Sequence, residues 1–82
     1  MKIQLRILNG AESPILVIPS ATATNMGGVK RLIDSALESV GIEERASSIL
    51  NDADLKLLKL QTSWVVITKP AGSYFLEIGV GK

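Results

Sequence analysis

The chain has 82 residues and a net charge of +1; 46% of its residues are hydrophobic, and none is histidine or cysteine. This length suits a single domain over residues 1–82, and the near balance of charge gives no bulk electrostatic attraction to nucleic acid. Without histidine and cysteine the chain lacks the side chain that titrates near neutral pH, the thiolate nucleophile and the usual ligands of zinc, haem and iron–sulfur sites, so we expect no metal, no cofactor and no enzyme activity.

The first residues predict a strand and a turn. Residues 2–7 alternate polar and apolar side chains, which is typical of a strand with one wet face. Asn9 and Gly10 both tolerate a positive φ and predict a turn after that strand. We expect the connection to run through residues 11–14, which makes the hairpin loop longer than two residues.

Residues 15–18 predict a second strand that is apolar on both of its faces. The run is Ile-Leu-Val-Ile, and it lies between Pro14 and Pro19. A strand without a polar face is typical of the centre of a sheet, or of a strand that a partner covers. Both alternatives stay open at this point.

The next segment predicts an amphipathic helix over residues 29–40. Gly41 stands where a glycine commonly ends a helix, and Ile42 can supply the hydrophobic contact of a Schellman motif. The other side of this helix is polar. Its apolar positions recur at helical spacing and are Val29, Leu32, Ile33, Ala36, Leu37 and Val40.

Two shorter segments follow the helix. Residues 43–52 predict a second helix, because apolar residues recur at helical spacing and two glutamates stand near its start. Residues 55–60 are ambiguous, since their partial alternation favours a strand whereas Asp54 can cap a further helical turn.

The C-terminal part predicts a hairpin. Residues 64–68 are rich in β-forming side chains, and residues 74–80 form the returning strand. Between them we expect a turn over residues 69–73, with Pro70 at its second position and Gly72 in a left-handed bulge.

The resulting order of elements is β-β-α-α-(β)-β-β. Strands grouped at both ends of the chain around helices indicate an α+β fold, with one small sheet of four or five strands and two helices packed on one face. Strands that begin at residue 2 and end near residue 80 place both ends of the chain in the sheet. We expect at least one of them to be an edge strand.

Residues 1–42 resemble the opening of the ubiquitin-like β-grasp family, in which a hairpin and a proline-containing loop precede an amphipathic helix that ends in glycine. The residues that carry this resemblance are Met1-Lys2-Ile3-Gln4-Leu5, Asn9-Gly10, residues 15–19 and Gly41-Ile42. The resemblance covers half of the chain and implies a similar fold there. The last residues, Gly79-Val80-Gly81-Lys82, lack the terminal Gly-Gly through which members of that family are conjugated, so carrier chemistry is not implied.

Residues 22–31 resemble a ligand-binding loop. Glycines at the start of a helix expose backbone N–H groups, and the positive end of the helix dipole attracts anions such as phosphate. The candidate anion site consists of Asn25, Gly27, Gly28, Lys30 and Arg31. The alternative is a loop capped by Thr24 or Asn25, in which the glycines permit close packing.

Two other groups of residues are weaker candidates. Asp52 and Asp54 are close in sequence, but we interpret Asn51 and Asp52 as turn and cap residues rather than as part of an acid–base site. A basic aromatic platform for single-stranded nucleic acid would consist of Lys56, Lys59, Lys69, Trp64 and Tyr74. The alternative places Trp64 in the core and the lysines along strand edges.

The apolar runs at residues 15–18 and 64–67 are far shorter than the ~20 residues that span a bilayer, and the first residues lack the apolar stretch of a signal peptide. We therefore expect no membrane partner and a cytoplasmic location.

The aliphatic content exceeds what a small core can hide. The leading hypothesis is a non-catalytic protein-interaction module that binds a protein partner or a second copy of itself as a homodimer. The alternative is a module that uses the candidate anion site to bind an anion or nucleic acid, and nucleic acid is the less favoured partner.

Overall fold

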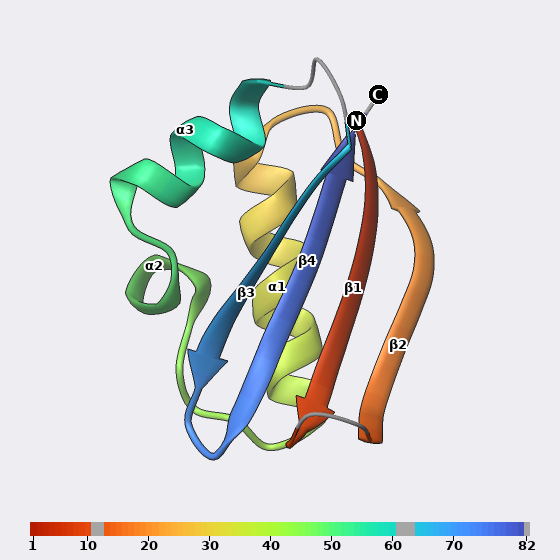
Figure 1. The fold of residues 1–82 in the computed structure, drawn as a ribbon, viewed down its shortest axis with the longest axis vertical. Helices are drawn as coiled ribbons and strands as arrows, with labels where there is room; N and C mark the ends of the chain where they lie inside the picture. The colour runs from red at the N-terminus through yellow and green to blue at the C-terminus, as the bar shows by residue number, and fades with distance from the viewer. Residues whose placement is uncertain (11–12, 61–63, 82) are drawn as a thin grey trace.

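The elements follow the order β-β-α-α-α-β-β along the chain. The computed structural model describes residues 1–10, 13–60 and 64–81. Its strands and helices are β1 (Lys2–Asn9), β2 (Ser13–Thr22), α1 (Met26–Ser39), α2 (Ala46–Ile49), α3 (Asp52–Leu60), β3 (Val65–Ala71) and β4 (Tyr74–Gly81). One four-stranded sheet with three helical segments confirms the predicted α+β class (Figure 1).

The sheet is antiparallel throughout, with its strands in the order β2-β1-β4-β3. The first and last strands lie side by side at its centre, where Leu5 pairs with Ile78 (Figure 1). The prediction that a strand at one end of the chain forms an edge is therefore wrong. The edges are β2 and β3, because the two hairpins join through β1 and β4. The alternative that placed residues 15–18 at the centre of the sheet is wrong for the same reason.

Alternation along the strands gives the sheet two different faces. On one of them, here called the inner face, Leu5 and Ile78 have no exposed surface. They belong to one core cluster with Leu37 and the other buried residues of α1, which lies behind the sheet in Figure 1. The opposite face, here called the open face, carries Gln4 and Arg6 on β1, and both are exposed.

The first hairpin turns where the sequence predicts it. Gly10 has a φ of 75°, which glycine adopts without strain. Asn9 pairs with Ser13, so residues 13–14 belong to β2 rather than to the loop. The predicted loop residues 11–12 lie outside the described residues.

α1 begins and ends with capping motifs that its sequence contains. Oδ1 of Asn25 accepts a hydrogen bond from the N–H of Gly28 at 3.0 Å and caps the start of the helix. At the other end Gly41 has a φ of 77°, and the N–H of Ile42 donates to the carbonyl oxygen of Leu37 at 2.9 Å. This hydrogen bond over six residues confirms the predicted Schellman motif.

Gly41→Ala should lower the free energy of unfolding by about 1 kcal/mol. A Cβ at this position would meet no atom within 4 Å, so the loss comes from the backbone conformation alone. Asparagine tolerates a positive φ better than alanine does, and Gly41→Asn should therefore cost less. Urea denaturation of both variants measures this order, and equal losses would contradict the conformational explanation.

Residues 55–60 are helical, so the strand that their alternation favoured is wrong. Asn51 and Asp54 form a capping box at the start of α3. The N–H of Asp54 donates to Oδ1 of Asn51 at 2.9 Å, and the N–H of Asn51 donates to Oδ2 of Asp54 at 3.0 Å. These two hydrogen bonds stabilise the first turn of α3, and residues 55–60 continue that helix. The predicted helix over residues 43–52 is shorter than expected, since α2 holds only four residues.

A two-residue turn, Gly72 and Ser73, joins β3 to β4, because Ala71 already pairs with Tyr74. Gly72 has a φ of 63°, in the left-handed region that was predicted. Pro70 lies inside β3 rather than in the turn, so the predicted turn over residues 69–73 is too long. An edge strand tolerates this proline, because one side of the strand has no neighbour to bond.

Candidate functional site

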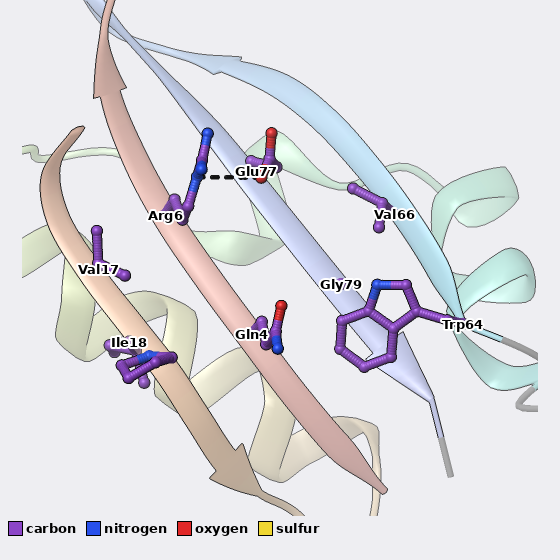
Figure 2. Close-up of a pocket in the computed structure, with 9 residues that line it drawn as sticks. Gln4, Arg6, Val17, Ile18, Trp64, Val66, Glu77 and Gly79 are labelled. Atoms are coloured by element: carbon purple, nitrogen blue, oxygen red, sulfur yellow. Dashed lines mark ion pairs between the residues drawn. The ribbon is translucent and has the colours of Figure 1, made fainter. Parts of the chain in front are cut away.

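The strand register fixes the arrangement of side chains on the open face. Arg6 on β1 pairs with Val17 on β2 and with Glu77 on β4, and Glu77 pairs in turn with Thr68 on β3. Nε of Arg6 lies 3.2 Å from Oε1 of Glu77, so these two side chains form an ion pair at the centre of the face (Figure 2). The row therefore has two charges in the middle and uncharged side chains at both edges.

Trp64 lies on the open face, across the backbone of β4 (Figure 2). Gly79 and Gly81 stand two residues apart on β4 and so face the same side of the sheet. A Cβ added at Gly79 would lie 2.8 Å from Cε2 of Trp64, and one added at Gly81 would lie 2.7 Å from Cε3. The two glycines leave the room that the indole occupies. Trp64 is 46% exposed, so the alternative that placed it in the core is wrong.

A shallow hollow of about 170 Å³, here called the trough, lies between the two edges of the open face. Val17 and Pro19 form its β2 wall, and Trp64 and Val66 form its β3 wall. The ion pair and Gln4 lie between the walls (Figure 2). The trough thus has apolar sides and a polar centre.

The lining of the trough combines apolar walls with few polar side chains. Its polar side chains are one amide, Gln4, and the Arg6–Glu77 pair. The side chains of that pair are 45% and 32% exposed, and an ion pair that is this accessible to water contributes little to stability. Aromatic and aliphatic walls around a few polar groups are typical of surfaces that bind through apolar contact.

A second apolar patch, here called the Phe75 row, crosses all four strands of the open face. Phe75 on β4 pairs with Leu8 on β1 and with Pro70 on β3, and Leu8 pairs with Pro14 on β2. Phe75 is 44% exposed. The Phe75 row lies beside the ion pair on the side away from Gln4, so the open face has apolar side chains on both sides of its charged centre.

The candidate anion site at the start of α1 is partly assembled. Oδ1 of Asn25 accepts the hydrogen bond that the N–H of Gly28 donates, as described above. The guanidinium of Arg31 reaches back along the helix, and its Nη1 lies 3.6 Å from the place where a Cβ of Gly27 would stand. The structure therefore brings these four residues together, whereas the contacts within the described residues do not place Lys30 with them. Anion binding at this site stays a prediction.

Asp54 makes structural contacts that do not suit acid–base catalysis. Its Oδ2 accepts the capping bond from Asn51 and lies 3.0 Å from Nζ of Lys69. The pKa of Asp54 lies below its usual 3.8, mainly because its carboxylate accepts the backbone hydrogen bond from Asn51. The Lys69 ammonium lowers this pKa as well, whereas partial burial raises it. A general acid near neutral pH needs a shift in the opposite direction.

Asp54→Asn should lower the melting temperature by roughly 5 °C at pH 7, because it removes the charged member of the capping box and of the Lys69 pair. The pKa of Asp54 is lower in the folded chain, so its carboxylate stabilises the fold fully above the unfolded value of 3.8. That contribution disappears as the pH falls through the folded pKa. The difference between wild type and variant should therefore shrink below pH ~4.

Thermal unfolding followed by circular dichroism over this pH range measures the effect. Asp52→Asn is the matched control, because it removes a carboxylate from the same first turn of α3 and leaves the Asn51 and Lys69 contacts in place. A difference between wild type and Asp54→Asn that stays constant down to pH ~2 would contradict the proposed linkage.

The residues considered for a basic aromatic platform do not share one surface. Trp64 lies on the open face, whereas Lys69 points toward Asp54 of α3 and Tyr74 packs against the core. Lys56 and Lys59 belong to α3. The sheet separates the indole from the lysine and the tyrosine, so the stacking surface that the pattern suggested is not formed by these residues.

The trough was not predicted from the sequence, although one signal for it is present. Glycines at residues 79 and 81 remove side chains from one face of a strand, and aromatic side chains commonly cover such a gap. Trp64, the tryptophan of the chain, is the natural candidate for that role.

Two negative findings apply to the described residues. None of their helices is long and apolar enough to cross a membrane. No group of three or more of their acidic side chains is placed to hold a metal ion.

Comparisons of the chain with protein-family models, with curated proteins and with solved structures found no match. The resemblance of residues 1–42 to the β-grasp family therefore has no support from these comparisons.

Proposed function

We propose that this chain is a small non-catalytic module that binds protein through the open face of its sheet. The observation that carries the proposal is the clustering of exposed apolar side chains. Six large hydrophobic side chains are exposed among the described residues, and four of them, Val17, Trp64, Val66 and Phe75, belong to this face. Single exposed apolar residues are ordinary, whereas a cluster of this kind is typical of an interaction surface.

The shape of the open face favours a protein over a small molecule as the ligand. The trough measures about 170 Å³, which is below the ~300 Å³ of the smallest common ligand pockets. The Phe75 row lies outside the trough on the same face. A ligand that covers both must be broad, and another protein surface meets that requirement.

A photo-reactive residue at Thr68 tests this proposal. Thr68 is exposed on the open face opposite Glu77, so a crosslinker there reaches whatever covers the face. In the cells that produce the protein, we expect an adduct of discrete mass from this position. The same residue at Glu38, which is exposed on α1, should give none. No adduct from Thr68, or equal adducts from both positions, would contradict the proposal.

The second proposal is anion binding at the start of α1, and the position of Arg31 favours it. Its guanidinium lies beside Gly27, at the end of the helix where the dipole already attracts negative charge. Binding of inorganic phosphate or an oligonucleotide there should weaken steeply as the salt concentration rises. Arg31→Glu should weaken it most, because its guanidinium lies at the site, and Lys30→Glu should weaken it less; a binding signal unchanged in both variants would exclude this site.

A further inference from the structure

We propose that a second copy of this chain covers the open face, related to the first by a two-fold axis parallel to the strands and between β1 and β4. This inference rests on the proposed function and adds the identity and the orientation of the partner. About such an axis, β1 of one copy lies opposite β4 of the other, and β2 lies opposite β3. The two sheets would then pack face to face, about 10 Å apart, as in a β-sandwich.

The polar centre of the open face is complementary to itself about this axis. Arg6 and Glu77 are register partners on β1 and β4, so Arg6 of each copy comes opposite Glu77 of the other. The two ion pairs then form a closed ring in which charges of opposite sign alternate. Burial of an isolated ion pair is unfavourable, and the additional partners in the ring offset that effect.

The apolar parts of the face match about the same axis. Val66 on β3 comes opposite the β2 wall of the second copy, whereas the Trp64 indole, which lies over Gly79 on β4, comes opposite Gln4 on β1 of that copy. Phe75 likewise comes opposite Leu8 of the second copy, because these two residues are register partners on β4 and β1. The axis that pairs Arg6 with Glu77 therefore also pairs Val66 with the β2 wall and Phe75 with Leu8.

The size of the face is sufficient for a dimer. The Cα atoms span 31 × 22 × 18 Å, and the view down the shortest of these dimensions shows the four strands side by side (Figure 1). Part of that outline belongs to α2 and α3, which lie beside the sheet in Figure 1, whereas four strands about 4.8 Å apart and about eight residues long give a face of roughly 500 Å². Burial of such a face on both copies covers about 1,000 Å² in total, which is near the lower limit for specific interfaces. Weak, transient complexes lie at this end of the size range, so we expect a dissociation constant in the micromolar range.

The edges of the sheet argue against the other common arrangement, a dimer that joins edge strands. β2 contains Pro14 and Pro19, and two register shifts interrupt its pairing with β1. β3 contains Pro70. Proline has no N–H to donate, and irregular edge strands resist pairing with another chain. The open face is the better surface for a second copy.

A pair of charge variants tests both the partner and the axis. Glu77→Arg places four positive charges at the centre of the dimer, and Arg6→Glu places four negative charges there. Each variant alone should therefore self-associate at least about 100-fold more weakly than wild type. In an equimolar mixture each positive side chain of one variant comes opposite a negative side chain of the other across the interface, although like charges stay adjacent within each copy, so the dimer should return only when the two are mixed. Sedimentation velocity measures the mass, and circular dichroism checks the fold.

Val66→Lys is an independent test that leaves the ion pair intact. The Val66 side chain is 51% exposed, so the folded chain accommodates a lysine there. Loss of apolar contact and burial of an ammonium group should weaken the dimer at least about tenfold. Leu57→Lys is the matched control, since Leu57 is 44% exposed on α3, outside the open face, and its variant should dimerise like wild type.

Three results would overturn the proposal of a second copy. They are a wild-type chain that stays monomeric up to about 100 µM, a mixture of charge variants that does not dimerise, and a Val66→Lys variant that dimerises like wild type. The crosslinker at Thr68 then separates this failure from failure of the proposed function. An adduct with a different protein keeps the open face as the binding surface, whereas no adduct removes both proposals.

Discussion

Leu5→Ala should lower the free energy of unfolding by about 3 kcal/mol. Leu5 lies in the central strand β1, pairs with Ile18 and Ile78 on its two sides, and has no exposed surface. Removal of three carbon atoms leaves a cavity between the sheet and α1 that the strand pairing prevents from closing. A chain of this length is stabilised by roughly 4–12 kcal/mol in total, so one substitution removes a large share.

Urea denaturation at a single low protein concentration measures this loss, and the low concentration limits any contribution from self-association. Leu57→Ala is the matched control, because it removes the same atoms from a side chain that is 44% exposed. It should change the free energy of unfolding by no more than about 0.5 kcal/mol. Equal losses in the two variants would show that the inner face is not the centre of the core.

Gly79→Val should displace Trp64 from β4 and lower the free energy of unfolding by about 1–3 kcal/mol. The new Cβ would lie 2.8 Å from Cε2 of the indole, so the two side chains cannot share the space. Displacement removes Trp64 from the β3 wall of the trough and leaves only Val66 there, and binding through the open face should fall with it. Trp64 is the single tryptophan of the chain, so its emission reports this movement directly as a shift to the red.

Thr68→Val is the matched control for this substitution. It places a valine on the same open face, on β3 opposite Glu77, in a different row from Gly79. Its emission spectrum should match that of wild type, with a change in the free energy of unfolding of no more than about 0.5 kcal/mol. An unchanged emission spectrum in Gly79→Val would mean that the indole does not lie over β4.

The parts of the fold that were predicted from the sequence depend on residues close together in the chain. The left-handed glycines at residues 10, 41 and 72 and the apolar stripe of α1 are of this kind. In each case a side chain, or the lack of one, determines the conformation of its own backbone or contacts the next helical turn. Such information is contained within a window of a few residues.

The strand order could not be read in the same way. It depends on pairing between residues 2–8 and 75–81, at opposite ends of the chain, and each hairpin can join the other through either of its strands. For residues 55–60 two local signals competed. The Asn51–Asp54 capping box outweighed the alternation of leucine and lysine that favoured a strand.

The open face was only partly predictable. The surplus of apolar side chains predicted an interaction surface. Its position in the fold depends on which face of the sheet each apolar side chain occupies. The trough depends on Trp64 meeting Gly79 and Gly81 across two strands, and that contact requires the register of β3 on β4. The capped start of α1 could be predicted from the sequence, because the capping loop and the helix are contiguous in the chain.

The central position of β4 has a consequence for the newly made polypeptide. As the chain leaves the ribosome, β1 and β2 can pair early, but one side of β1 stays bare until residues 74–81 emerge. Insertion of the last strand between two earlier ones closes a loop of nearly the whole length, which is slow compared with helix formation. Assembly of the sheet should therefore wait until residues 74–81 have left the ribosome, and loss of these few residues should abolish the sheet rather than shorten it.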